Sequence, residues 1–378
     1  MAFANNHKIS YYFKFRLSFA LFILVGGICV NFLHIRNETG SARVCARQPR
    51  DIFSPVLTKA FSGRYFLSAS IDYGRYSNAK ISLVESLAIA LLLNRTAVIP
   101  HIECCRETSK SAFGLFDFSA LPVPVISIDA FDFESNCDAN GNHWIYVDSG
   151  ASSFMSEEPS SFRGRMPERL QDLGGSLLQH LESNELKDFT CIVLSKHFKV
   201  FQSSAVTTSF DRAQLTITSL LLPHHAIAVE ARRFLYNNRR HAQPFVGIHL
   251  RQTDFLTWGE HKSFAKACNN NPDLILRYLR NVDSHTLPAE TQQPFVLATD
   301  DYFSACSQAA LEKSKVVSLL SASIFKRGSC EEASFDQEVL GASAFFIGDG
   351  TSTFSDAIRL IRTNRYQFSH KSNIRLYV

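Results

Sequence analysis

Apolar residues recur at strand and helix spacing along most of the chain. Just after residue 62 the stretch RYFLSAS is typical of a strand, and from Lys80 to Leu92 apolar residues return every three or four positions. The following stretch, RTAVIP, is typical of a short buried strand that ends at Pro100. The pattern predicts a unit made of a strand, a glycine-containing turn, a helix and a second strand.

The last third of the chain shows the clearest alternation. The predicted strands are FVGIHL, FVLATD, KVVSLL and AFFIGDG, and the predicted helices lie around residues 274–282, 304–313, 335–343 and 354–362. Strands that alternate with helices favour a parallel sheet covered on both faces, with ligands at the carboxyl ends of the strands. We therefore expect an α/β protein with two Rossmann-like domains that face a cleft.

The region between these two patterns is less regular. Residues 101–185 are rich in serine and predict loops and short elements, whereas FTCIVLS has the composition of a strand that returns to the first sheet. Residues 212–240 predict helix interrupted at Pro223. We place the two domains at residues 61–240 and 241–378.

An uncharged apolar stretch at residues 17–35 precedes these domains and follows Lys8, Lys14 and Arg16. It approaches the roughly 20 residues that cross a bilayer, and no clear cleavage site follows it. We expect an uncleaved signal anchor here, with residues 1–16 as a cytoplasmic tail and residues 36–60 as a stem. The alternative is a signal peptide that is removed.

Sequons and cysteines indicate on which side of the membrane the chain lies. Asn37 and Asn94 each begin a glycosylation sequon, which is used only in a lumenal segment. Cys29 lies in the anchor, and an even number of cysteines follows it: Cys45, Cys104, Cys105, Cys137, Cys191, Cys268, Cys306 and Cys330. They suit an oxidising compartment and up to four disulfides of open connectivity, or else buried thiols. We expect a single-pass type II protein of the Golgi or endoplasmic reticulum membrane.

Composition and charge narrow the chemistry. With 378 residues, 46% of them hydrophobic, the chain can bury a large core. A net charge of +4 is too small to predict a nucleic-acid partner. The chain has no Asp-x-Asp sequence, which many sugar transferases use to hold a metal, and we expect no metal and no other obligatory cofactor.

Two strand ends carry candidate phosphate ligands. In HLRQTDF, His249 and Arg251 follow an apolar strand on one face, and the planar guanidinium of Arg251 suits a phosphate. The alternative is a structural ion pair of Arg251 with Asp254 or Asp300.

The second strand end reads FFIGDGTSTFSDAI, which predicts a glycine loop, a cluster of hydroxyl groups and a helix N-terminus. Such an N-terminus can hold an anion because its first N–H groups lack intrahelical partners. The alternative is an ordinary helix with Ser352 or Thr353 as N-cap and Asp356 in its first turn. The loop is neither a P-loop nor a dinucleotide fingerprint.

Three stretches together resemble the GDP-fucose protein O-fucosyltransferase family, nearest the branch that acts on EGF-like repeats. They are GRYSNAKISLVESLAIALLLNRT, PFVGIHLR and FDQEVLGASAFFIGDGTSTFS. The resemblance implies a GT-B-type glycosyltransferase that inverts the sugar and moves fucose from GDP-fucose to Ser or Thr hydroxyls. Its acceptor would be a secreted or membrane protein with EGF-like repeats, and the C-terminal domain would bind GDP-fucose.

The same resemblance assigns the site. The implied donor-binding residues are Arg75, Tyr76, Ser77, Asn78, His249, Arg251, Asp336, Thr353 and Phe354. Arg251 would contact the β-phosphate and, with Asn78, carry catalysis, because fixed positive charge stabilises the departing diphosphate. Asp336 would contact the nucleoside, and Thr353 with Phe354 would close the phosphate loop.

The chain departs from the family pattern at the turn, where Gly-Asn-Gln is replaced by Ser77, Asn78 and Ala79. The glutamate base of a second branch is replaced by Arg75, so no general base is evident, and Glu85 is expected to face solvent. Two other functions stay open: a fucosyltransferase that acts on a glycan, and a non-catalytic lumenal binding protein of the same fold.

Overall fold

The structure is a computed structural model of the 378-residue chain. It describes residues 63–68, 76–102, 110–138, 144–147, 169–170, 181, 186–194, 208–238, 245–251, 264–286, 295–312, 316–319, 324–350, 352–369 and 372–376. Within these ranges no helix combines the length and the apolar character that crossing a membrane requires. The expected tail, anchor and stem, with Asn37, lie outside the described residues.

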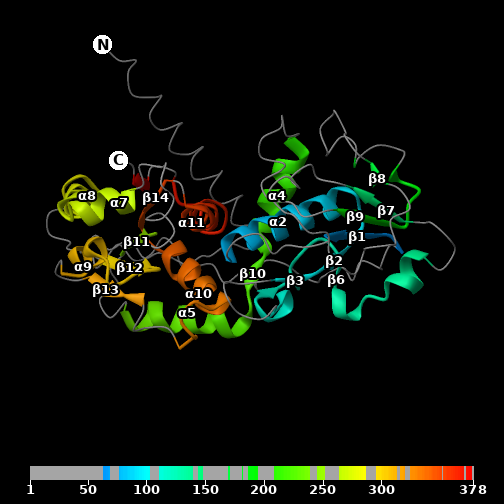
Figure 1. The fold of residues 1–378 in the computed structure, drawn as a ribbon, viewed down its shortest axis with the longest axis horizontal. Coiled ribbons are helices and arrows are strands. Elements are labelled where there is room, and N and C mark those ends of the chain that lie inside the picture. Colours follow the sequence, from blue (N-terminus) through cyan, green and yellow to red (C-terminus); the bar gives the residue numbers. More distant parts are fainter. Residues whose placement is uncertain are drawn as a thin grey trace, which may run out of the picture. The chain divides into compact units, whose positions relative to one another are not determined.

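The first half of the described chain forms a parallel sheet in the strand order β6-β2-β1-β9-β7-β8 (Figure 1). Its strands are β1 (Tyr65–Ser68), β2 (Thr96–Ile99), β6 (Val125–Ser127), β7 (Trp144–Val147), β8 (Arg169–Leu170) and β9 (Cys191–Leu194). Helix α2 (Tyr76–Leu92) connects β1 to β2 and packs against α4 (Thr208–Leu220). The predicted strand, helix and second strand are thus present, although α2 begins four residues before Lys80, and the predicted glycine turn lies outside the described residues.

Short elements complete this half and lead into the second. Antiparallel pairs join β3 (His101–Ile102) to β4 (Lys110–Ser111) and β5 (Phe116–Asp117) to β10 (Leu222–Pro223). Single helical turns cover Ala112–Gly114 (η3), Ile128–Ala130 (η4) and Glu134–Asp138 (η5). Pro223 does separate α4 from the next helix, α5 (His225–Asn238), which packs along α10 of the second half.

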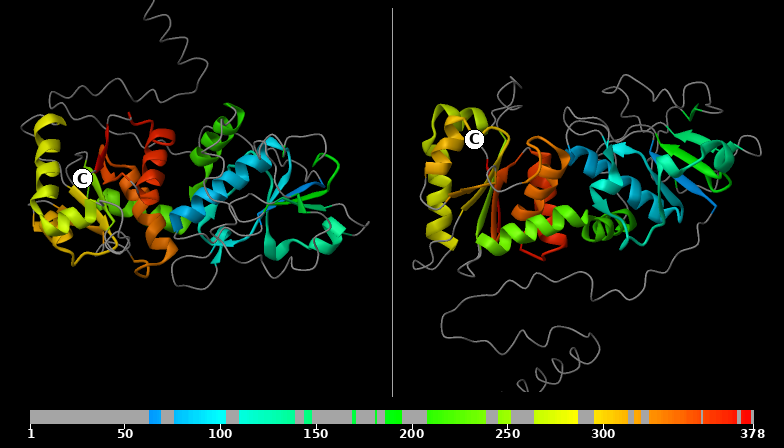
Figure 2. Two further views of the ribbon diagram at one scale, coloured as in Figure 1. Left: turned by 45° about the horizontal axis from the view of Figure 1, so that its top comes forward. Right: turned by 90° about the horizontal axis from the view of Figure 1, so that it is seen from below.

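The second half is a parallel sheet in the order β13-β12-β11-β14-β15 with helices on both faces (Figure 2). Its strands are β11 (Val246–Leu250), β12 (Phe295–Thr299), β13 (Val316–Ser318), β14 (Phe345–Asp349) and β15 (Asn373–Leu376). Its helices are α7 (Phe264–Asn270), α8 (Asp273–Thr286), α9 (Ala305–Glu312), α10 (Cys330–Gly341) and α11 (Thr353–Asn364). Because the strand order reverses at β11, the crevice between β11 and β14 is the expected ligand position.

One hydrophobic cluster joins the two halves. It contains Leu83 and Leu87 of α2 together with Phe335 and Val339 of α10 and Phe346 of β14. Helices α2 and α11 lie side by side, and both contact α4. The packing of α2 and α10 therefore sets how the carboxyl ends of the second sheet face the first turn of α2.

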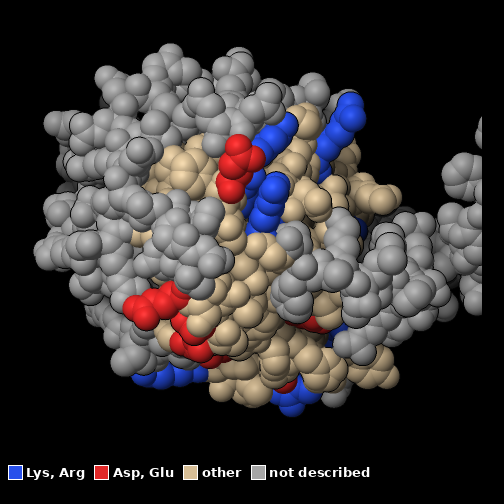
Figure 3. All heavy atoms as spheres, turned by 90° about the vertical axis from the view of Figure 1, so that its right-hand side faces the viewer, with Lys and Arg blue, Asp and Glu red and all other residues tan. Residues whose placement is uncertain are grey.

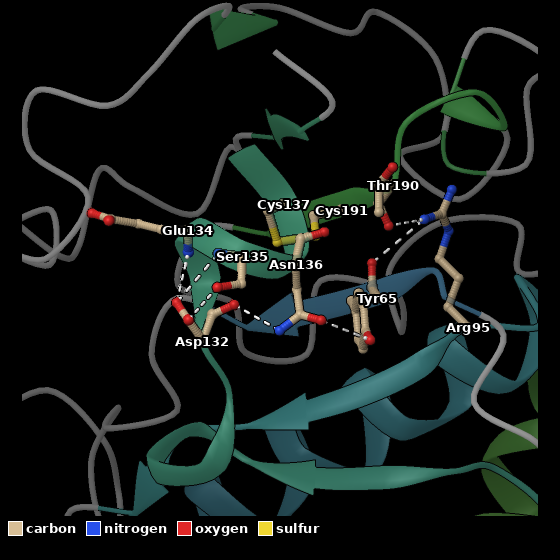
Figure 4. The surroundings of a disulfide bond; sticks show 9 residues. All are labelled: Tyr65, Arg95, Asp132, Glu134, Ser135, Asn136, Cys137, Thr190 and Cys191. Carbon is tan, nitrogen blue, oxygen red and sulfur yellow. Dashed lines mark hydrogen bonds between the residues drawn. A yellow bond between two sulfur atoms is a disulfide. The ribbon is translucent and has the colours of Figure 1, made fainter. Parts of the chain in front are cut away.

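Disulfides confirm the expectation of oxidised cysteines. Cys137 and Cys191 join η5 to β9, next to a hydrogen bond of 3.0 Å from the Tyr65 hydroxyl to Asn136 Oδ1 (Figure 4). A second disulfide, Cys268 to Cys306, joins α7 to α9, and Cys330 is disulfide-bonded as well. These bonds restrict the unfolded chain and so stabilise the fold.

The sequon at the end of α2 divides into an exposed and a buried part. Asn94 is exposed, with a positive φ of 52°. Arg95 is buried and donates to the carbonyls of Thr190 and Leu186, each at 3.0 Å, and burial lowers its pKa to about 10. A glycan on Asn94 stays a prediction, at the end of α2 opposite to its first turn.

Candidate functional site

The candidate site lies where the sheet order reverses, at the carboxyl ends of β11 and β14. His249 near the end of β11 is buried, and its Nδ1 lies 2.9 Å from Ser355 Oγ in the first turn of α11. The His249 ring also stacks on Phe354, with ring centroids 4.5 Å apart. Gly348 is needed for this approach, because a Cβ there would lie 2.6 Å from Ser355 Oγ. The structure thus brings the predicted His249 and Phe354 together.

Burial keeps the His249 imidazole neutral. Desolvation lowers the pKa of His249 to about 3; the negative charge of Asp300 opposes this shift, and the charges of Arg251 and Arg359 add to it. A neutral ring can hold a hydrogen bond to a ligand without bringing a second cation beside Arg251.

We expect His249 to stay neutral throughout the range of an enzyme assay. The NMR signal of the His249 imidazole can be assigned because a His249→Gln variant lacks it. In the wild type this signal should not titrate between about pH 5 and pH 8. The unfolded chain has an ordinary pKa of about 6.5, so it binds a proton that the folded chain does not between that pH and about 3. Stability should therefore decrease as the pH is lowered from about 6.5 to about 3, and it should decrease less in His249→Gln. An ordinary titration of His249 would contradict its buried position.

The N-terminus of α11 is arranged differently from an ordinary capped helix. Ser352 occupies the N-cap position, yet its side chain makes no cap hydrogen bond, and its Oγ is buried without a partner. Asp356 pairs with Arg359 at 2.7 Å, and Arg359 also donates to the carbonyls of Gly348 and Asp349. The Arg359 side chain therefore fixes the end of β14 against α11. The Ser352 hydroxyl and the N–H groups of the first turn of α11 suit an anion.

Arg251 directly follows β11, next to the end of β12. Its Nε is buried, and its charge acts on the neighbouring His249. Asp300, one of the two candidate ion-pair partners, directly follows β12, whose last residue pairs with Leu250, whereas Asp254 and the predicted Arg75 lie outside the described residues. Both roles of Arg251, phosphate ligand and ion pair, fit this position.

Two further predicted residues hold buried oxygens without a partner. Asp336 on α10 has a buried Oδ1 that accepts no hydrogen bond, and burial, followed by the charge of Glu332, raises the pKa of Asp336 well above its usual range. Asn78 in the first turn of α2 likewise has a buried Oδ1 with no partner. Since buried polar atoms are normally paired, the unpaired oxygens of Asn78, Asp336 and Ser352 indicate that a polar ligand completes the site.

The neighbours of Asn78 are held by protein groups. The Tyr76 ring is buried and stacks on Phe116, with centroids 6.0 Å apart. Ser77 Oγ accepts a hydrogen bond from Gln337 Nε2 at 2.9 Å. Thr353 is the first residue of α11 and stands half-buried. In this turn Asn78 Oδ1 and the Tyr76 hydroxyl are the buried polar atoms without a hydrogen-bond partner.

The expectation for Glu85 is wrong. Its side chain is 0% exposed, because α4, α10 and α11 all pack on α2 and cover the polar positions of that helix as well as the apolar ones. Ser86 lies in the same layer, with its Oγ 2.6 Å from that of Ser68. Helical spacing alone does not reveal that several elements surround a helix.

The described residues contain no group of three or more His, Cys, Asp or Glu side chains that could hold a metal ion. Acidic and basic side chains occur next to one another on the face shown in Figure 3, which is consistent with the small net charge.

Comparison with known proteins gives three findings. Residues 66–365 match the family model described as GDP-fucose protein O-fucosyltransferase. The crystal structure of POFUT1 in complex with GDP is similar, with a TM-score of 0.57 and 15% identity over 83% of this chain and 98% of that one. The POFUT1 complex with GDP-fucose has a TM-score of 0.56 and 15% identity over 85% of this chain and 99% of that one. The apo form of POFUT1 has a TM-score of 0.54 and 14% identity over 84% of this chain and 98% of that one. No curated protein sequence matches. The structural likeness extends over both parallel sheets.

Proposed function

The chain belongs to the GDP-fucose protein O-fucosyltransferase family, and on that premise we propose that it transfers fucose from GDP-fucose to Ser or Thr hydroxyls of a protein acceptor. The observation that carries this proposal is the switch point between β11 and β14. There a neutral His249, an arginine and an α11 N-terminus with an unused Ser352 hydroxyl come together. This set of groups suits a diphosphate.

The architecture proposed for this reaction is of the GT-B type. The sheet that begins at β11 would bind GDP-fucose within residues 241–378, and residues 61–240 would bind the acceptor. The support is the presence of two parallel sheets and the similarity in fold to POFUT1.

The proposed mechanism depends on charge that develops on the leaving group. As the bond from the anomeric carbon to the β-phosphate oxygen breaks, the electron pair leaves with GDP, and Arg251 and the N-terminus of α11 stabilise the added negative charge. The acceptor oxygen forms the new bond from the opposite face, which inverts the anomeric carbon, and its hydroxyl proton is released to water. Asn78 Oδ1 offers an acceptor for a sugar or substrate hydroxyl, and no metal is needed because fixed cations replace it.

The acceptor proposed is a folded EGF-like repeat of a secreted or membrane protein. We propose that the chain meets it in the lumen of the Golgi or endoplasmic reticulum, held by the anchor at residues 17–35. Immunofluorescence should then show the protein in one of these compartments, and a cytosolic location would contradict the lumenal proposal.

An acceptor screen tests the proposed reaction. The purified chain, with GDP-fucose and excess EDTA, should modify a folded EGF-like domain and leave a folded thrombospondin-like domain and an N-glycan unmodified. Transfer only to the N-glycan would show that the acceptor is a glycan and not a protein. Transfer that needs added manganese would contradict the metal-free mechanism. Failure to bind GDP and to hydrolyse GDP-fucose would make the chain a non-catalytic member of the family.

A further inference from the structure

A buried cation connects the two halves of the molecule beside the proposed donor site. Lys80 in the second turn of α2 is 7% exposed, and its Nζ donates to Gln337 Oε1 on α10 at 3.0 Å. The Gln337 amide then donates from Nε2 to Ser77 Oγ at 2.9 Å. Both ends of one amide side chain are thus used, and its orientation is fixed.

Burial opposes the charge of Lys80, whereas the neighbouring aromatic rings and Glu338 favour it. Its Nζ lies 6.0 Å from the Tyr76 ring centroid and 5.8 Å from that of Phe116, so it lies beside two aromatic rings that stack on each other. Burial lowers the pKa of Lys80 to about 8; Glu338 on α10 opposes this shift, and Arg365 after α11 adds to it. Glu338 already has a partner, because Arg365 Nη1 lies 2.5 Å from its carboxylate. Because an apolar side chain of similar size would avoid the cost of burying a charge, stability alone does not account for Lys80.

The bridge holds the two segments that carry unpaired oxygens. Ser77 directly precedes Asn78, and Gln337 directly follows Asp336, whose Oδ1 is buried without a partner like that of Asn78. The two segments lie on different helices and in different halves of the chain. The contact between Ser77 and Gln337, which are the neighbours of these two residues, links the segments directly.

We propose that Lys80 is a positioning residue for GDP-fucose, which acts through Gln337 to hold the first turn of α2 against α10. This role rests on the proposed function. Ser77 stands where the family pattern has a glycine. Glycine has no side chain, whereas the Ser77 hydroxyl accepts a hydrogen bond from the Gln337 amide. The position at which the chain departs from the family pattern thus contributes a contact that fixes the first turn of α2.

Removing the bridge should weaken donor binding more than it slows the chemical step. Lys80→Met, Gln337→Leu and Ser77→Ala should each raise the Kd for GDP and the KM for GDP-fucose by about tenfold, which corresponds to about 1.4 kcal/mol. The kcat should change much less. Gln337→Glu should bind nearly as well as the wild type, because its carboxylate accepts from Lys80 and from the Ser77 hydroxyl.

The test is calorimetric titration of GDP into the full chain and these variants, with melting temperatures measured alongside. Lys266→Met removes an exposed lysine from α7 and should bind GDP as the wild type does. Folded Lys80→Met and Ser77→Ala proteins with wild-type affinity would overturn the proposal, and so would equal defects in Gln337→Leu and Gln337→Glu. If Lys80→Met does not fold, the Kd values for GDP of Ser77→Ala, Gln337→Leu and Gln337→Glu test the proposal. A wild-type chain that binds no GDP would instead refute the proposed function.

Discussion

Replacement of Arg251 by alanine is expected to reduce turnover of GDP-fucose by on the order of 10²-fold, the effect of removing one preorganised donor from a developing oxyanion. Arg251 follows β11 at the switch point, and its charge acts on the neutral His249 beside it. Arg251→Lys should restore only part of the rate, because lysine keeps the charge and loses the planar pair of donors. The measurement is kcat at saturating donor.

A structural ion pair would give a different result. If Arg251 served mainly to pair with Asp254, then Arg251→Ala and Asp254→Ala should lower the melting temperature equally. We expect instead that Asp254→Ala retains most of the turnover and that Arg251→Ala retains the melting temperature. Near-normal turnover in a folded Arg251→Ala protein would remove this residue from the mechanism.

Replacement of Arg362 by alanine should have the largest effect on stability. Its side chain is 0% exposed and donates to Ser343 Oγ at 2.8 Å, to the carbonyl of Ala344 at 3.0 Å, to Ser372 Oγ at 2.8 Å and to Asn373 Oδ1 at 2.6 Å. It also contacts the carbonyl of Ser343. These bonds tie α11 to β15 and to the start of β14.

Truncating Arg362 leaves several of these acceptors unpaired. At about 1–3 kcal/mol for each buried unsatisfied group, we expect a loss of at least roughly 3 kcal/mol in the free energy of unfolding. Chemical denaturation of Arg362→Ala measures it. Arg212→Ala is the control, because Arg212 is exposed on α4 and its truncation should change stability little. Equal midpoints for the two variants would contradict this role of Arg362.

Sequence periodicity predicted the second sheet well. The stretches FVGIHL, FVLATD and AFFIGDG correspond to β11, β12 and β14, and the helices expected between them are α8, α9, α10 and α11. Buried parallel strands are apolar along their whole length, so each one stands out from the amphipathic helix that follows.

The elements that sequence reasoning missed have weaker patterns. Strand β15 alternates polar and apolar residues at the edge of its sheet, α7 has only seven residues, and β6 and β7 lie within a stretch expected to be mostly loops. Such short segments gain their structure from the sheet or helices they join. The domain boundaries at residues 61–240 and 241–378 stay a prediction.

The positions of the candidate site residues were predictable where these residues lie at the end of a strand or directly after it. His249, Arg251 and the loop before Thr353 are placed by parallel topology, which puts the carboxyl ends of strands at one edge. Ser355, Lys80 and Gln337 were missed because their roles depend on contacts across about 100 to 260 positions of sequence. For Ser355 a signal existed, since it belongs to the same hydroxyl cluster as Ser352 and Thr353.

The most direct test of the donor site is a calorimetric titration of the purified full chain with GDP, compared with ADP. The wild type should bind GDP in preference to ADP without added metal, and Arg251→Ala and Asp336→Ala should each bind it more weakly. Equal, weak heats for the two nucleotides, unchanged by either substitution, would contradict a GDP-fucose site at the ends of β11 and β14.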